Sequence, residues 1–161
     1  MESRIELLPE KILIGKSMRM SLAQNRTPVL WRGFMMEKGQ IKDQIGSDLY
    51  SIQVYDGLQY FETFSPTTEF TKWAATEVRK IENIPNGFSS IALKSGLYAV
   101  FIHKGTSADF PRTFQYIFSQ WLPKSGYELD DRPHFELLGE RYRNNDPSSE
   151  EEVWIPIRKK A

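Results

Sequence analysis

The order of predicted elements repeats along this chain, and the repeat limits the possible fold more than any single motif does. Residues 11–22 include an alternation of polar and apolar side chains typical of a half-buried strand, and a helix begins near Thr27-Pro28. Two further strands follow over residues 48–55 and 70–78, although the alanines of the second would also suit a helix. From residue 87 onward the order of strand, helix and two strands returns. The sequence therefore predicts two similar β-α-β-β units.

The second helix is marked by its apolar spacing. Pro111 lies near its start, and Pro123 and Gly126 end it. Its apolar residues recur three or four positions apart, and they are Phe114, Ile117, Phe118, Trp121 and Leu122. A β-α-β-β unit leaves one face of its sheet uncovered, so pairing two units would bury both faces. We therefore predict an α+β fold of two paired β-α-β-β units, with a cleft where the halves meet that could hold a ligand.

Chain length and composition bound the domain count and the classes of function. A chain of 161 residues with 40% hydrophobic content suits one domain over residues 1–161, with half-repeats at approximately 1–86 and 87–161. Lys plus Arg and Asp plus Glu number 21 each, so we expect no direct nucleic-acid binding. The absence of cysteine fits a reducing compartment. No apolar run is long enough to cross a bilayer, so we expect a cytoplasmic protein without membrane contact.

Motifs for a metal or a cofactor are weak. His103 and His134 are the only histidines, and no cysteine supplements them. The acidic stretch from Asp146 to Glu152 does not follow the calcium-loop pattern, and we interpret it as a solvated turn. Gly15-Lys16-Ser17 matches the end of a phosphate-binding loop, but Glu10 stands where that loop needs glycine. We predict no metal and no cofactor.

The stretch from His134 to Tyr142 carries the most informative pattern. A strand without a bulge here would place four residues on one face, namely Glu136, Leu138, Glu140 and Tyr142. Such a face commonly points to solvent. If it instead seals a pocket, a carboxylate among aromatic rings would attract a cation, or would handle a proton once burial raised its pKa.

Several segments in series resemble the GyrI-like (gyrase-inhibitor-like) small-molecule-binding domains, which also occur as effector-binding modules of AraC-type and MerR-type regulators. The segments that carry the resemblance are residues 96–105, 113–123, 125–136, 139–142 and 151–157, with weaker matches over 50–55 and 73–78. No helix-turn-helix precedes the predicted domain, so the chain is similar to the stand-alone members.

The resemblance implies an α+β fold in which pseudo-twofold duplicated β-α-β-β units form an antiparallel sheet, with two main helices packed on it and an aromatic ligand cleft between the halves. In the family a Glu on the penultimate strand, with a nearby Tyr, lies in that pocket, and Glu140 with Tyr142 are the matching residues. Trp73 with Glu77 is a looser match from the first half. The remaining candidate ligand-binding residues are Tyr55, Trp121 and Trp154. Each tryptophan would equally serve the core, and Glu77 would equally be an exposed strand residue.

Members of the family differ in activity, so three functions stay open. We favour a stand-alone binding protein for apolar or aromatic, often cationic, small molecules, acting through aromatic stacking and Glu140. A hydrolase of strained electrophiles such as cyclopropanes would instead use Glu140 as a general base, helped by Tyr142. A protein that acts on DNA gyrase would need a protein interface and no ligand pocket.

Overall fold

The protein, described by a computed structural model over residues 1–63 and 65–161, is built from nine strands and two main helical segments. The strands are β1 (Ser3–Leu8), β2 (Lys11–Met20), β3 (Leu49–Val54), β4 (Phe70–Glu77), β5 (Ser89–Leu93), β6 (Gly96–Lys104), β7 (Tyr127–Leu129), β8 (His134–Leu138) and β9 (Glu150–Lys159). The helical elements are α1 (Thr27–Glu37), η1 (Lys38–Gln40), η2 (Leu58–Phe61), η3 (Ser107–Asp109), α2 (Phe110–Tyr116), η4 (Ile117–Trp121) and α3 (Leu122–Lys124). The helices of the described ranges are too short or too polar to cross a lipid bilayer.

The strands form one antiparallel sheet in the order β1-β6-β9-β8-β3-β4-β2-β5, with β7 added beside β9. Strands β3 and β8 lie at its centre, and the order on one side of them mirrors the order on the other. The first strand of each half pairs with the other half, since β1 pairs with β6 and β5 pairs with β2. The predicted α+β fold of two duplicated units is therefore confirmed.

The hydrogen-bond register shows how closely the two halves correspond. Leu8 lies opposite Gly96 in one exchanged pair, and Leu93 lies opposite Lys11 in the other. The short loop from Leu8 to Lys11 has the same length as the loop from Leu93 to Gly96. The two halves are thus related residue by residue through a pseudo-twofold axis between β3 and β8.

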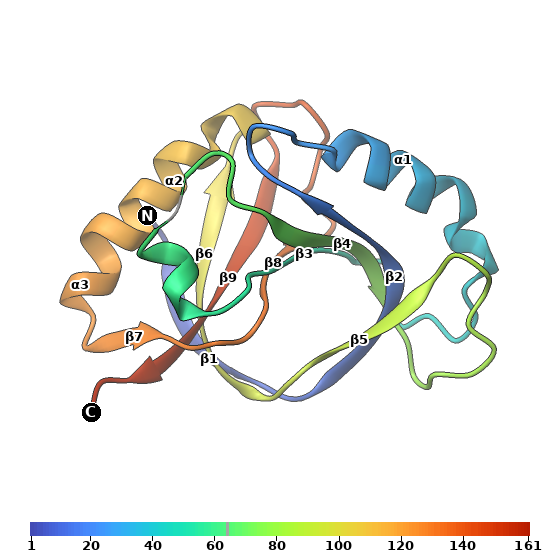
Figure 1. The fold of residues 1–161 in the computed structure, drawn as a ribbon, viewed down its shortest axis with the longest axis horizontal. Helices are drawn as coiled ribbons and strands as arrows, with labels where there is room; N and C mark the ends of the chain where they lie inside the picture. Colours follow the sequence, from blue (N-terminus) through green and yellow to red (C-terminus); the bar gives the residue numbers. More distant parts are fainter. Residues whose placement is uncertain (64) are drawn as a thin grey trace.

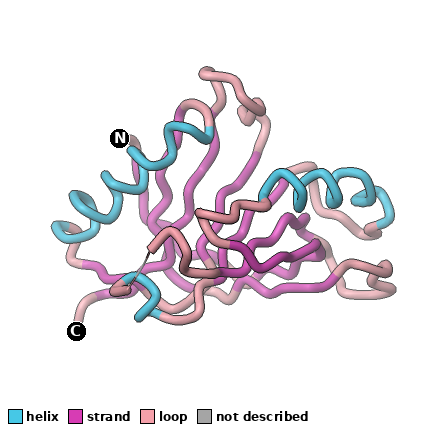
Figure 2. Tube along the Cα trace, turned by 45° about the horizontal axis from the view of Figure 1, so that its top comes forward, coloured by secondary structure: helices cyan, strands magenta, loops and turns pink. Residues whose placement is uncertain are grey.

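Both main helices lie on the same side of the sheet, which we call the helix face (Figure 1). Helix α1 packs on β2 and β4 through Leu30 and Phe34. The run from α2 to α3 covers β6 and β9, and Ile117 is its buried centre. Figure 2 shows the two helices as separate cyan segments above the magenta strands. The middle strands β3 and β8 therefore lie between the areas that the helices cover.

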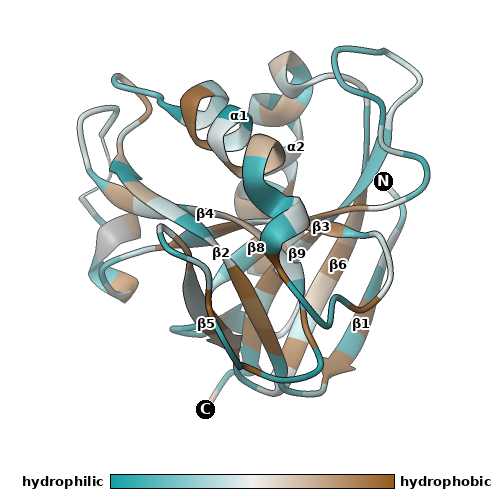
Figure 3. Ribbon diagram, turned by 90° about the vertical axis from the view of Figure 1, so that its right-hand side faces the viewer, coloured by the Kyte–Doolittle hydropathy of each residue, from teal (hydrophilic) through white to brown (hydrophobic). Residues whose placement is uncertain are grey.

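The opposite side of the sheet, which we call the inner face, carries a separate apolar core. Its buried members are Leu8, Leu13, Tyr50, Ile52, Ala75, Leu93, Tyr98, Val100, Phe135 and Trp154. Apolar residues run along β2 and β6, drawn in brown in Figure 3. The side chains of β3 alternate, so Tyr50 and Ile52 reach the inner face, whereas Ser51 and Gln53 belong to the helix face.

Three local features differ from or refine the predictions. The stretch from Phe70 to Glu77 is a strand, as the alternation predicts and despite its alanines. The second helix contains the π-helical segment Ile117–Trp121, because Pro123 has no N–H to donate to the carbonyl four residues earlier. The predicted strand from His134 to Tyr142 is wrong in its length. Strand β8 ends at Leu138, and the Tyr142 N–H closes a turn on the Gly139 carbonyl at 3.1 Å.

Candidate functional site

Two carboxylates are buried at the middle of the helix face. Glu136 on β8 is 6% exposed, and its Oε1 accepts one hydrogen bond, from Gln53 Nε2 of β3 at 3.1 Å. Glu151 on β9 is 8% exposed. No cation of the described residues lies within ion-pair distance of either carboxylate, although the charge of Lys72 acts on both. The helix face therefore buries acidic groups without full neutralisation, which is costly unless a partner arrives.

Burial perturbs both carboxylates. It raises the pKa of Glu136, and the nearby Lys72 and the hydrogen bond from Gln53 only partly oppose this. Burial, together with the neighbouring charge of Glu136, raises the pKa of Glu151 to about 8. The two neighbouring carboxyl groups therefore resist carrying two negative charges at neutral pH.

A ladder of rings leads from α2 to His134 of β8 and on to Tyr55. Its members, in order, are Phe110, Phe114, Phe118, Phe61, His134 and Tyr55. Phe61 of η2 lies between Phe118 at 6.0 Å and His134 at 5.5 Å, roughly parallel to both. His134 lies two residues before Glu136 on β8, so the two side chains share the helix face. His134, the fifth ring of the ladder, is therefore the next side chain on the same face of β8 as the buried Glu136.

His134 takes part in the ladder as a neutral ring. Complete burial, together with the nearby Arg132, lowers its pKa to about 3. It consequently carries no positive charge at physiological pH and does not neutralise Glu136. Beside it lies a small pocket of about 90 Å³, whose lining includes Tyr55, Phe61 and His134.

The predicted pair Glu140 and Tyr142 lies outside β8. Glu140 is exposed in the turn after the strand, so we do not carry its predicted pocket role forward. Tyr142 is half-buried in the following loop, and its hydroxyl donates to Asn144 Oδ1 at 3.3 Å. Burial and the charge of Glu151 raise the pKa of Tyr142, so this residue does approach the carboxylates.

The remaining predicted residues divide between the two faces of the sheet. Tyr55 belongs to the aromatic ladder of the helix face. Trp121 packs edge-on against Phe101 at 5.1 Å in the core beneath α2. The predicted residues at the inner face are Trp73, Glu77 and Trp154.

Sequence reasoning did not identify the burial of Glu151 and did not select Glu136 as a candidate site residue. The acidic stretch before Val153 was interpreted as a solvated turn, but Glu150 already begins β9. Glu151 alternates with Val153 and Ile155, both buried on the helix face, and this spacing could have identified it. Glu136 lies on the same predicted strand face as Glu140, and placing the end of the strand at Leu138 would have separated the two residues.

In the part of the chain that the structure describes, the histidines and acidic residues do not assemble into a metal centre. Among the described residues no group of three or more His, Cys, Asp or Glu side chains could hold a metal ion. His103 is buried with both ring nitrogens engaged, since Nδ1 lies 2.7 Å from Thr113 Oγ1 and Nε2 lies 3.0 Å from the Thr106 carbonyl. His103 therefore links β6 to α2 through Thr113 and to the intervening loop through Thr106.

Comparison with known proteins places this arrangement among ligand-binding domains. Residues 1–158 match the GyrI-like small molecule binding domain. A transcriptional regulator, BrlR of Pseudomonas aeruginosa, is 36% identical over 93 residues, which are 57% of this chain and 34% of the regulator. The matched region is thus about a third of that relative.

Solved structures share the fold at low sequence identity. The structure of SAV2435 bound to tetraphenylphosphonium has a TM-score of 0.75 at 16% identity, covering 98% of this chain and 94% of that one. A hydrolase encoded by lin2189 from Listeria innocua has a TM-score of 0.61 at 9% identity, covering 98% and 92%. The match over nearly the whole sequence and the shared fold agree: this chain belongs to the GyrI-like small molecule binding domain family.

Proposed function

We propose that this protein binds aromatic small molecules that carry a positive charge, on the helix face beside Glu136. The observation that carries the proposal is a buried carboxylate with a single neutral hydrogen-bond donor, next to His134 of the aromatic ladder on the same face of β8. A cation at Glu136 would recover electrostatic energy that the free protein lacks, and a neutral ligand of equal shape would not. The ladder adds stacking and cation–π attraction.

Entry of such a ligand requires movement of η2. The pocket of about 90 Å³ beside His134 is too small for a drug-sized molecule, since ligand pockets usually measure about 300–1,000 Å³. Phe61 occupies the slot between Phe118 and His134 that a flat ligand ring would take. Segment η2 is a single turn of four residues, so its displacement disrupts little regular structure. The tetraphenylphosphonium complex of SAV2435 supports a lipophilic cation as the ligand class.

The test compares a cation with a neutral ligand of similar shape. We expect methyltriphenylphosphonium to bind more tightly than triphenylphosphine oxide, and Glu136→Gln to weaken only the cation. A loss of about tenfold to a hundredfold in affinity corresponds to about 1.4–2.7 kcal/mol, within the range of a desolvated cation–carboxylate contact. Isothermal titration calorimetry measures both ligands.

Glu140→Gln is the matched control, because it makes the same chemical change four residues away in an exposed turn. Its affinity for the cation should stay within twofold of the wild type. Equal cation binding by the wild type and by Glu136→Gln would refute the proposal. A loss of cation affinity in Glu140→Gln alone would instead assign the contact with the cation to Glu140, as the sequence predicts.

A second candidate, hydrolysis of a strained electrophile, rests on the same carboxylates. Glu151, with a pKa of about 8, and Glu136 lie beside each other, and Tyr142 is near Glu151. A carboxyl group with a raised pKa is suited to proton transfer with water near neutral pH. The test is an assay for turnover of a cyclopropane-bearing electrophile. Turnover by the wild type that is abolished in both Glu136→Gln and Glu151→Gln would favour hydrolysis over binding alone. Interaction with DNA gyrase stays a prediction, which a pull-down with gyrase subunits tests.

A further inference from the structure

The inner face has two ends that correspond through the pseudo-twofold axis. At one end Gln44 bridges Val78, and the Ile45 N–H donates to the Glu77 carbonyl at 2.8 Å. At the other end the equivalent contacts are the Leu129–Ile157 pair and the bond from the Asp130 N–H to the Pro156 carbonyl at 3.0 Å. Three residues after each bridging residue stand Ser47 and Arg132. Ser47 therefore occupies the position that Arg132 has in the second half.

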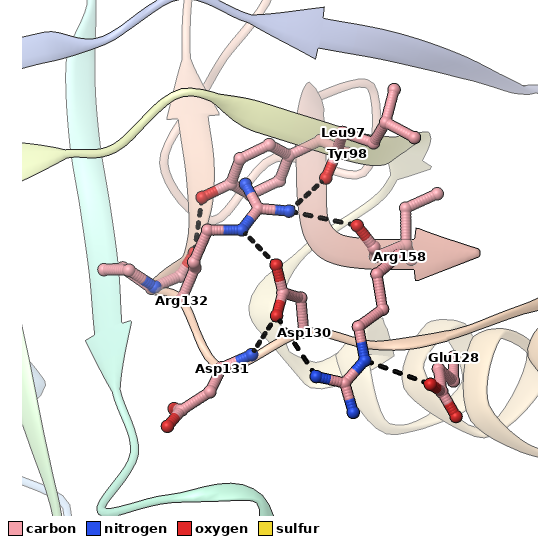
Figure 4. Close-up of polar contacts among 9 residues, drawn as sticks. Leu97, Tyr98, Glu128, Asp130, Asp131, Arg132 and Arg158 are labelled. Carbon is pink, nitrogen blue, oxygen red and sulfur yellow. Dashed lines mark hydrogen bonds and ion pairs between the residues drawn. The ribbon is translucent and has the colours of Figure 1, made fainter. Parts of the chain in front are cut away.

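Arg132 closes the second-half end of the inner face (Figure 4). Its guanidinium carbon lies 4.7 Å from the centre of the Tyr98 ring, and its side chain is 10% exposed. Nε donates to Asp130 Oδ2 at 2.8 Å, and Nη2 donates to the carbonyls of Leu97 and Ile157. Gly96 leaves room for this side chain, because a Cβ there would stand 2.5 Å from Nη1. A planar cation thus fills this end.

The first-half end has no such side chain. Ser47 is short and exposed, and Lys11 replaces Gly96 at the equivalent strand position. A pocket of about 360 Å³ lies here, a size that accepts a small ligand. Its aromatic floor is formed by Tyr50, Phe135 and Trp154, with Phe135 stacked on Trp154 at 5.2 Å. The pocket is therefore an open counterpart of the end that Arg132 fills.

The charges around this pocket favour a cation. Three carboxylates line it, from Glu6, Asp48 and Glu77, and Arg4, which is not among the lining residues, pairs with Glu6 at 2.7 Å. Lys11 Nζ pairs with Glu77 Oε1 at 3.2 Å, whereas Asp48 has no ion pair in the part of the chain that the structure describes. Burial and the nearby Glu77 raise the pKa of Tyr50, so its phenol adds no charge. A positive ligand would offset this negative charge, as the Arg132 guanidinium offsets Asp130 at the other end.

We propose that this inner-face pocket binds a small organic cation in which a guanidinium or amidinium is attached to a flat apolar group. The cation would face Glu77 and Asp48, and the apolar group would lie on Trp154 and Tyr50. This site lies on the opposite side of the sheet from Glu136, so it is independent of the helix-face proposal.

Phenylguanidinium is the probe, and phenylurea is its neutral counterpart. Titration is followed by the ¹H–¹⁵N resonance of the Trp154 indole, whose N–H donates to Glu152 Oε1 at 3.0 Å. We expect phenylguanidinium to shift this resonance and phenylurea to leave it in place. Ser47→Arg, which supplies the missing plug, should weaken binding at least tenfold, and Ser47→Ala should leave affinity within twofold. Glu77→Gln should also weaken binding at least tenfold.

Glu136→Gln separates this proposal from the helix-face site. It should leave unchanged the phenylguanidinium affinity read from the Trp154 indole resonance, which reports on the inner face, whatever its effect on cations bound at the helix face. A Trp154 resonance that does not move at millimolar phenylguanidinium would overturn the proposal. Equal affinity of the wild type and Ser47→Arg would overturn it as well, because the exposed substitution leaves the fold intact and fills the pocket.

Discussion

Replacing Arg132 by methionine tests how much the closed end of the inner face contributes to stability. The carbonyls of Leu97 and Ile157 would each lose a charged donor, worth about 1.5–3 kcal/mol apiece. Tyr98 would lose the cation over its ring, worth about 0.5–2 kcal/mol. Against this, Nη1 is buried without a hydrogen-bond partner among the described residues, and its removal regains about 1–3 kcal/mol. We therefore expect Arg132→Met to lower the free energy of unfolding by about 2–4 kcal/mol.

Urea unfolding measures this loss as a lower midpoint at an unchanged slope. In a thermal scan the same loss lowers Tm by about 5–15 °C for a domain of this size. Arg158→Met is the matched control, because Arg158 also pairs with acidic neighbours, at 3.0 Å from Glu128, but is half-exposed. We expect its effect to stay below about 1 kcal/mol. Equal losses of unfolding free energy in the two variants would refute the argument that Arg132 contributes more because it is buried over the Tyr98 ring.

The pH dependence of the Arg132→Met effect follows from Asp130. Burial would raise the pKa of Asp130, but hydrogen bonds from Arg132 and from the Asp131 N–H outweigh it, and the net pKa is lowered. A lowered carboxyl pKa stabilises the folded state above the unfolded pKa, about 3.9, and this contribution is lost as the pH falls through the folded value. The difference between the wild type and Arg132→Met should therefore shrink in acid.

Two further predictions concern the helix face and the sheet. The pKa of Glu151 is raised to about 8 in the folded state, so its contribution to stability is fully present below the unfolded pKa of about 4.3 and is lost as the pH rises to about 8. We therefore expect the Tm of the wild type to fall between these two pH values, and the Tm of Glu151→Gln to fall less. Gly15→Ala should destabilise the protein by about 3 kcal/mol or more, because the new Cβ would meet the backbone of Ala74 and Ala75 at 2.1 and 2.7 Å. Gly33→Ala in α1 is its control, since nothing lies within 4 Å of the new Cβ, and it should stabilise by about 0.5–1 kcal/mol in the same urea titration. A neutral Gly15→Ala, or a Tm of Glu151→Gln that follows the wild type, would contradict these arguments.

The sequence predicted the architecture because alternation and helical spacing are local signals. The strand from Phe70 to Glu77 is recognisable from its alternation, and the helix after Pro111 from its apolar spacing. The exchange of β1 and β5 between the halves has no local signal, because it depends on pairing between residues far apart in the chain. The π segment before Pro123 likewise reflects a missing donor rather than a pattern.

The candidate site was less predictable than the fold, for a physical reason. Glu136 and Glu140 share one face only while the strand continues, so a prediction that extends the strand too far does not tell which of the two carboxylates is buried. The end of β8 at Leu138 is fixed by the turn at Gly139 and by the Glu150 N–H bonded to the Arg141 carbonyl at 3.0 Å. This loop geometry exposes Glu140 and leaves Glu136 as the buried acid of the strand. Aromatic residues far apart in sequence, such as Phe61 and Phe118, meet only in the folded chain.

The reciprocal pairing of β1 with β6 and of β5 with β2 is the arrangement that two copies of one half-length chain would adopt if each lent its first strand to the other. In such a dimer symmetry would force both ends of the inner face to be identical. Joining the two copies in one polypeptide releases that constraint. One end can then be filled by a side chain of the protein itself while the other keeps an open pocket.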